Sequence, residues 1–138
     1  MLRKISIILL VGLFLSSCGY LANLNVTENA GSEARGYEII TVEDLQDLME
    51  EEDITLINVH IPLEGNIPDT DLEIPFDEIE NFTDQLPENK DEKIVIYCRS
   101  GGMGNTASET LVDLGYTDVS NLKGGYNVWT AMDLPFEE

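Results

Sequence analysis

Positively charged residues are scarce in this chain. Seven lysines and arginines stand against 27 aspartates and glutamates, and the formal net charge is −20. Because so few cations cannot form a basic surface that follows a phosphate backbone, nucleic acid is a poor candidate partner. The acidity is typical of a solvated surface that keeps a protein soluble, and adaptation to high salt or to an acidic substrate is the alternative. With 138 residues, the chain is long enough for one domain with a hydrophobic core.

The apolar run near the N-terminus, residues 5–15, is too short for a membrane-spanning helix, which needs about 20 residues. It follows Arg3 and Lys4, as in a signal peptide. The run ends in Leu15-Ser16-Ser17-Cys18, which resembles the lipobox of bacterial lipoproteins. The resemblance implies that residues 1–17 are a lipoprotein signal peptide and that Cys18 carries the lipid. An exported protein, lipid-anchored to a membrane in the periplasm or at the cell surface, is therefore expected; an ordinary secretory signal with an incidental cysteine is the alternative.

Cysteine is also rare, since the chain has only Cys18 and Cys98. If Cys18 carries lipid, Cys98 has no partner within the chain. An unpaired cysteine in an exported protein indicates a reactive thiol or an intermolecular disulfide. A buried, inert cysteine is the other interpretation of Cys98 at this point.

Residues 18–36 show no hydrophobic periodicity, and we expect them to form a flexible tether. A single folded domain is expected over residues 37–136. Within it, strands are predicted at residues 54–59 and 93–97, with shorter extended pieces at 72–74 and near 119. Helices are predicted from residue 42 after a Thr41–Asp44 capping pair, and at 77–86, 105–114 and 127–132.

Strands that alternate with helices predict an α/β fold with a mostly parallel central sheet and helices on both faces. In such sheets, ligands bind beyond the carboxyl ends of the strands. Cys98 directly follows the predicted strand 93–97. The cysteine is therefore expected at the edge of the sheet where this architecture carries its chemistry.

The loop after that strand reads CRSGGMG, residues 98–104. Glycines in such a loop let successive backbone amides point to a common centre and bind an anion, and the following helix adds its positive N-terminal end. A thiolate at that centre would be stabilised and would be a better nucleophile. Arg99 adds a positive charge beside it.

Four segments, in this order and spacing, resemble the rhodanese family of sulfurtransferases. They are Leu56-Ile57-Asn58-Val59-His60; Gly65-Asn66-Ile67-Pro68 with Ile74-Pro75; Tyr97-Cys98-Arg99-Ser100-Gly101; and Leu114-Gly115-Tyr116-Thr117-Asp118-Val119 with Leu122-Lys123-Gly124-Gly125-Tyr126-Asn127-Val128-Trp129. The resemblance implies a three-layer rhodanese-like domain over residues 37–136.

The family's chemistry implies roles for the loop. Cys98 would take a sulfane sulfur from a donor as a persulfide and pass it to a thiol or cyanide acceptor, without a metal or organic cofactor. The substrate-binding residues would be those whose backbone surrounds the persulfide: Arg99, Ser100, Gly101, Gly102, Met103 and Gly104. A redox partner protein is a further candidate partner, and membrane contact would come through lipidated Cys18.

The chain departs from the family's pattern at several positions. Met103 and Gly104 stand where Arg and then Ser or Thr are frequent, which would weaken the binding of a doubly charged donor such as thiosulfate and favour a less polar or protein-bound one. Asn58 and His60 replace frequent Asp and Arg, and we expect them to support the loop by hydrogen bonding, with a catalytic His60 as the alternative.

Three more residues are expected to have structural roles or have two possible interpretations. Tyr126 and Trp129 are expected to pack in the core. Glu64 is either a solvated loop residue or a partner of Arg99.

Two other functions compete with sulfur transfer. Related phosphatases and arsenate reductases need an arginine separated from the cysteine by five residues, and this chain has Gly104 at that position, so they are disfavoured. A rhodanese-like module retained for protein binding or redox sensing is the stronger rival.

Overall fold

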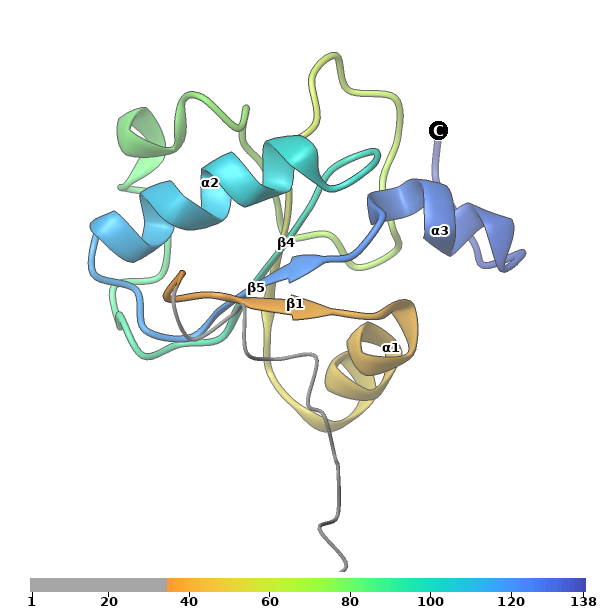
Figure 1. Ribbon diagram of the computed structural model, residues 1–138, viewed down its shortest axis with the longest axis horizontal. Helices are drawn as coiled ribbons and strands as arrows, with labels where there is room; N and C mark the ends of the chain where they lie inside the picture. The colour runs from red at the N-terminus through yellow and green to blue at the C-terminus, as the bar shows by residue number, and fades with distance from the viewer. Residues whose placement is uncertain (1–34) are drawn as a thin grey trace, which may run out of the picture.

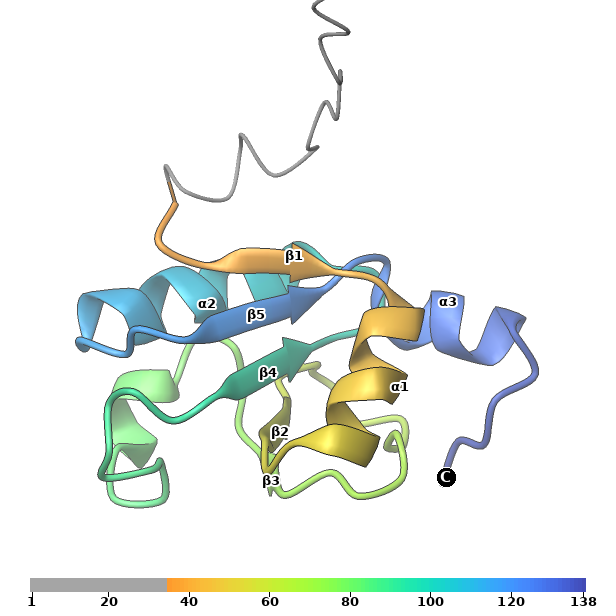
Figure 2. The same ribbon diagram turned by 90° about the horizontal axis from the view of Figure 1, so that it is seen from below.

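The computed structural model describes residues 35–138 as one α/β domain around a five-stranded sheet. Residues 1–34, with the predicted signal peptide, Cys18 and most of the predicted tether, lie outside the described residues. The strands are β1 (Glu38–Ile40), β2 (Thr55–Asn58), β3 (Leu72–Glu73), β4 (Ile94–Tyr97) and β5 (Val119–Leu122). They lie in the order β1-β5-β4-β2-β3, and each neighbouring pair is parallel (Figure 2).

The middle of the sheet is the most buried part of the domain. All four residues of β4 are buried, as are all four of β5. Strands covered on both faces are continuous apolar runs rather than alternating ones, which is why residues 94–97 read Ile-Val-Ile-Tyr. The parallel register pairs Asn58 with Tyr97, so the chain leaves β2 and β4 at the same edge.

Helices cover both faces of this sheet, as the sequence predicts (Figure 1). Helices α1 (Val42–Glu51) and α3 (Gly125–Ala131) cover one face, and α2 (Gly102–Asp113) with the short 3-10 helix η2 (Ile79–Phe82) covers the other. Leu45 and Trp129 belong to the apolar cluster of the first face, and Ala107 and Leu111 to that of the second. The α/β three-layer fold is confirmed.

Helix α1 begins with the predicted cap. The hydroxyl oxygen of Thr41 accepts a hydrogen bond from the backbone N–H of Asp44 at 3.2 Å, and the Thr41 N–H donates to the Asp44 carboxylate at 2.8 Å. These reciprocal bonds satisfy two donors that a helix N-terminus leaves free. They start the helix directly after β1 and turn the chain back along the sheet.

Two elements differ from the prediction. The predicted helix at 77–86 is reduced to η2, held by i→i+3 bonds such as Asn81 N–H to the Glu78 carbonyl. Asn, Thr and Asp in this stretch are poor residues for a helix interior, although Ile79 and Phe82 still contact the core. Strand β1 was not predicted, because three residues are too few to show an alternation of apolar and polar side chains. These residues form a strand because they pair with β5.

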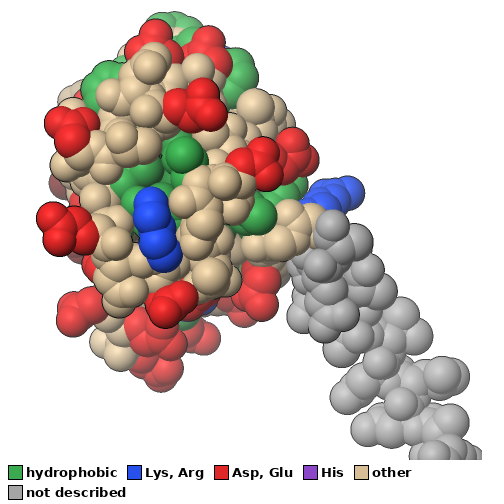
Figure 3. All heavy atoms as spheres, turned by 90° about the vertical axis from the view of Figure 1, so that its left-hand side faces the viewer, with side chains coloured by type: hydrophobic (Ala, Val, Ile, Leu, Met, Phe, Trp, Pro, Cys, Tyr) green, Lys and Arg blue, Asp and Glu red, His purple; other side chains and the backbone are tan. Residues whose placement is uncertain are grey.

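The surface remains strongly acidic. Figure 3 shows acidic side chains spread over one face of the domain, with few basic ones among them. Among the described residues, none of the helices combines the length and apolar character needed to cross a membrane.

Candidate active site

Cys98 directly follows β4, at the carboxyl edge of the sheet. Its side chain is only 1% exposed and forms no disulfide. The Sγ atom accepts a hydrogen bond from the backbone N–H of Gly101 at 3.0 Å. The sulfur is therefore already held by a main-chain donor of the glycine loop, which favours the sulfur when it carries negative charge.

Helix α2 begins at Gly102, inside the loop. Gly101 is its N-cap residue, and the first helical bond runs from the Asn105 N–H to the Gly101 carbonyl. No side chain caps this end and no acidic residue lies in its first turn. The first N–H groups of a helix have no partner within it, so the loop has free donors and uncompensated positive potential. Ser100 and Gly102 are exposed, whereas Gly104 is buried.

The loop is held in place by the segments that follow β5. The N–H groups of Tyr126 and Asn127, at the start of α3, donate to the carbonyls of Cys98 and Arg99 at 2.9 and 3.0 Å. From β5, the Asn121 side-chain amide donates to the Gly101 carbonyl at 3.1 Å and to Asn105 Oδ1 at 2.8 Å. These bonds fix the loop backbone, and with it the Gly101 donor.

Gly104 makes room for Asn121. A Cβ atom at position 104 would lie 2.1 Å from Asn121 Oδ1, well inside contact distance. Asn121 is 1% exposed, so it has no open space to move into. The departure from the family pattern at position 104 therefore matches the close approach of a buried neighbour.

We expect Gly104→Ala to lower the free energy of unfolding by about 1–3 kcal/mol, because the added methyl displaces the Asn121 side chain. Gly102→Ala is the matched control, since a Cβ atom there meets nothing within 4 Å and alanine is the better helix former. Urea denaturation of residues 19–138 measures both. In the Asn121→Ala background the cost of Gly104→Ala should shrink, and an equal cost in both backgrounds would contradict the explanation.

Asn58 shapes the loop that follows β2. Its side-chain amide donates to the Gly65 carbonyl and to Asn66 Oδ1, both at 2.9 Å, and its Oδ1 accepts the His60 N–H at 3.0 Å. The side chain is 2% exposed. The hydrogen bonds of the Asn58 side chain therefore support the loop after β2, and none of them reaches the cysteine loop.

His60 contacts Glu64 and Tyr126. Its Nε2 lies 3.5 Å from Glu64 Oε2, and its ring packs edge-on against Tyr126 with 5.6 Å between the ring centroids. The His60 Nδ1 atom is buried without a hydrogen-bond partner. These contacts place His60 in a side-chain cluster beside the cysteine loop.

Glu64 is the centre of that cluster. The Tyr126 hydroxyl donates a short hydrogen bond to Glu64 Oε2, and Arg99 Nη1 lies 3.4 Å from Glu64 Oε1. This bond lowers the pKa of Glu64, while burial and the same bond raise the pKa of Tyr126. Of the two interpretations of Glu64, the structure supports the partner of Arg99.

Sequence reasoning missed the polar role of Tyr126. Its ring is buried, as predicted, but its hydroxyl reaches a residue 62 positions earlier in the chain. The residues next to Tyr126 in the sequence do not indicate a partner that lies so far away along the chain. Trp129 packs in the core as predicted and donates from Nε1 to the Pro135 carbonyl.

Met103 is partly buried and packs against the apolar cluster that contains Cys98. Its side chain supplies neither a charge nor a hydrogen-bond donor at the position where the family often has arginine. Arg99 is therefore the only basic residue in the cysteine loop, residues 98–104. Its side chain is already paired with Glu64.

Two shallow hollows adjoin the loop region. One, of about 230 Å³, is lined by Ile39, Ser100, Gly101, Gly102, Asn105, Asn121, Leu122, Lys123 and Gly124. The other, of about 200 Å³, is lined by Asn58, His60, Ile61, Leu63, Glu73, Ile74 and Pro75. Both lie where parallel strands end, which agrees with the expected location of a ligand site.

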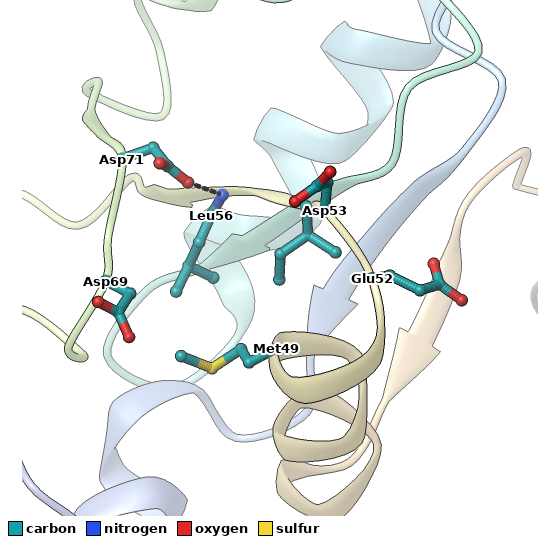
Figure 4. Close-up of a pocket in the computed structure, with 7 residues that line it drawn as sticks. Met49, Glu52, Asp53, Leu56, Asp69 and Asp71 are labelled. Atoms are coloured by element: carbon teal, nitrogen blue, oxygen red, sulfur yellow. Dashed lines mark hydrogen bonds between the residues drawn. The ribbon is translucent and has the colours of Figure 1, made fainter.

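A third hollow, of about 190 Å³, lies at the opposite edge, where α1 ends and β2 begins (Figure 4). Its acidic residues include Asp71, whose carboxylate accepts the Leu56 N–H at 2.8 Å. Among residues 35–138, no group of three or more His, Cys, Asp or Glu side chains is arranged to hold a metal ion.

Comparisons with known proteins agree with this geometry. The family model described as "Rhodanese-like domain" matches residues 41–132. A "Sulfurtransferase" of Allochromatium vinosum is 39% identical over 93 residues, which cover 65% of this chain and 84% of that protein. "Rhodanese-like domain-containing protein 15, chloroplastic" of Arabidopsis thaliana is 43% identical over 49 residues, 36% of this chain, and the match spans about a quarter (27%) of that protein.

A solved structure shows the same fold. The crystal structure of a rhodanese-related protein from Thermoplasma volcanium superposes with a TM-score of 0.62 at 26% identity, covering 72% of this chain and 97% of that one. The parallel sheet, the cysteine at the end of β4 and the matched segment of residues 41–132 all lead to one assignment. The chain belongs to the rhodanese-like domain family.

Proposed function

We propose that this protein is a sulfurtransferase or persulfide carrier in which Cys98 is the nucleophile. The observation that carries the proposal is the hydrogen bond from the Gly101 N–H to Cys98 Sγ, at the uncapped N-terminus of α2. Backbone donors that already contact the thiol can also bind the outer sulfur of a persulfide, which carries negative charge. The family assignment and the relative named as a sulfurtransferase support the same chemistry.

The reaction has two steps. The Cys98 thiolate attacks the sulfane sulfur of a donor, a new S–S bond forms, and the donor's S–S bond breaks with its electron pair leaving on the rest of the donor. An acceptor, a thiol or cyanide, then attacks the outer sulfur of the persulfide and Cys98 leaves as a thiolate. The backbone donors of the loop are positioned to stabilise both anionic forms of the side chain.

The test is the mass of the protein. Purified residues 19–138 would be incubated with thiosulfate or with a persulfide donor, and then with cyanide. A gain of one sulfur atom that cyanide removes is the expected result. If no donor adds sulfur to Cys98, the protein is not a sulfurtransferase.

A module for protein binding or redox sensing is the second candidate. The large hydrophobic side chains that the described residues leave exposed are Ile61, Leu63, Val128 and Met132. The first two lie in the loop after β2 and the others in and just after α3, the two segments that also supply the contacts around Arg99. Exposed apolar side chains in these segments favour a protein partner, and this candidate gains if sulfur loading fails.

The proposal also includes membrane attachment through a lipid on Cys18, supported by the lipobox-like residues 15–18 after an apolar run. Each buried methylene of an acyl chain contributes about 0.8 kcal/mol, so several chains hold a protein firmly. We expect the full chain, expressed in a bacterial host, to enter the detergent phase on phase separation, and the Cys18→Ala protein to stay in the aqueous phase. Retention of Cys18→Ala in the detergent phase would contradict lipidation at this residue.

A further inference from the structure

The carboxylate of Glu64 lies among residues from three segments near the cysteine. His60 comes from the same loop, Arg99 from the cysteine loop, and Tyr126 from α3. Glu64 is not covered by any role that the family motifs imply. Because Glu64 lies next to Arg99, its negative charge affects how the site binds a charged substrate.

The carboxylate is held in place although it is 42% exposed. An exposed ion pair alone, such as Arg99 with Glu64 at 3.4 Å, is weak because water screens it and both side chains are long. Here, however, the buried Tyr126 donates a hydrogen bond to the other carboxylate oxygen. This bond keeps Glu64 ionised and near Arg99, since it also lowers the Glu64 pKa.

The other basic residues lie outside the cysteine loop, residues 98–104. In the described part of the chain they are Arg35, Lys90, Lys93 and Lys123. Lys93 pairs with Asp118, and Lys90 lies over the Tyr116 ring. Lys123 lines a hollow together with Gly101 and Gly102, and Cys98 is not among the residues that line it.

This arrangement separates two classes of sulfur donor. Thiosulfate carries two negative charges, so while its sulfane sulfur reaches Cys98 its sulfonate group needs a cation outside the loop. Arg99 is occupied by Glu64, and the fixed carboxylate repels the sulfonate. A persulfide in its R–S–SH form carries no sulfonate, so its transferred sulfur needs only the backbone donors of the loop.

We infer that Glu64 is a specificity-determining residue, which by pairing with Arg99 directs the site to persulfide donors and against thiosulfate. The inference rests on the proposed sulfur transfer at Cys98 and specifies its donor class. In the favoured step, the Cys98 thiolate attacks the terminal sulfur of R–S–SH. The Cys98 S–S bond forms, the donor S–S bond breaks, and R–S⁻ leaves with the electron pair. Total charge is conserved and no external oxidant or reductant is needed.

Glu64→Gln tests this role, because the amide can still accept from Tyr126 but cannot neutralise Arg99. With the full chain, the rate of sulfur loading on Cys98 would be measured by mass against the concentration of thiosulfate and, separately, of glutathione persulfide. We expect the loading efficiency with thiosulfate to rise about tenfold, through a lower half-saturating concentration, and that with glutathione persulfide to change less than twofold.

Two further variants show whether the gain acts through Arg99. Glu51→Gln removes the same charge at the end of α1, at the opposite edge of the sheet, and should change neither donor more than twofold. Arg99→Gln added to Glu64→Gln should remove the gain with thiosulfate. An unchanged ratio between the donors in Glu64→Gln, or an equal gain in Glu51→Gln, would overturn the inference. If wild type takes sulfur from neither donor, the proposed function itself fails.

Discussion

Replacing Cys98 by alanine is expected to abolish sulfur uptake. The loading rate of residues 19–138 should fall by at least about 10³-fold, to the limit of detection, because no other thiol remains in that segment. Alanine leaves the Gly101 donor without its sulfur but keeps the loop backbone, whose bonds to Asn121, Tyr126 and Asn127 do not involve the thiol. Mass measurement after incubation with each donor checks the result.

The Cys98→Ala protein should still fold. The sulfur atom is buried, and its removal costs about 1 kcal/mol, as for the loss of a similar small group from a core. Circular dichroism and urea denaturation would show an unchanged fold with this small loss of stability. Inactivity can then be attributed to the missing nucleophile rather than to unfolding.

Cys98→Ser is the matched variant. Serine is close in size and its oxygen can accept from Gly101, so the contacts of the loop are kept. A serine hydroxyl is not ionised near neutral pH and does not form a stable bond to sulfane sulfur, so we expect no loading here either. Cyanide-sensitive sulfur on the alanine or serine protein would show that the sulfur binds elsewhere, and the role of Cys98 would be wrong.

Gly125→Ala is expected to be the most destabilising single change at the site. A Cβ atom at this position would lie 2.0 Å from the Cys98 carbonyl oxygen and 2.6 Å from the Arg99 carbonyl carbon. The residue also has a φ of +58°, in the left-handed region, which costs about 1–2 kcal/mol for a residue with a side chain. Because both clashing atoms are backbone, the cysteine loop and α3 must separate.

We expect a loss of about 3 kcal/mol or more in the free energy of unfolding, together with slower sulfur loading. The separation would also break the bonds from Tyr126 and Asn127 to the loop carbonyls. Gly115→Ala is the control, since Gly115 has a φ of +93° but no atom within 4 Å of an added Cβ. Gly115→Ala measures the conformational cost alone, and an equal loss in the two variants would contradict the backbone clash.

Much of the fold could be predicted because its signals are local. The apolar run at residues 94–97 and the capping pair at Thr41 and Asp44 are read within a few residues, and both appear as expected. The prediction of a helix at 77–86 was wrong. The spacing of its apolar residues fits a helix, but its polar residues favour tight turns. Strand β1 exists because β5 offers it a partner, which no local pattern records.

The candidate active site likewise combines features that are local in the sequence with contacts between distant residues. The position of the cysteine, after a buried strand and before a glycine-rich helix start, can be read from the sequence alone, because both features are contiguous. Folding alone places Asn121 in the space beside Gly104 and brings Glu64 to Arg99 and Tyr126, across 35 and 62 positions of the chain. Such contacts depend on the order of the parallel strands and on the paths of the loops between them, so side chains far apart in the chain meet only once the sheet has formed.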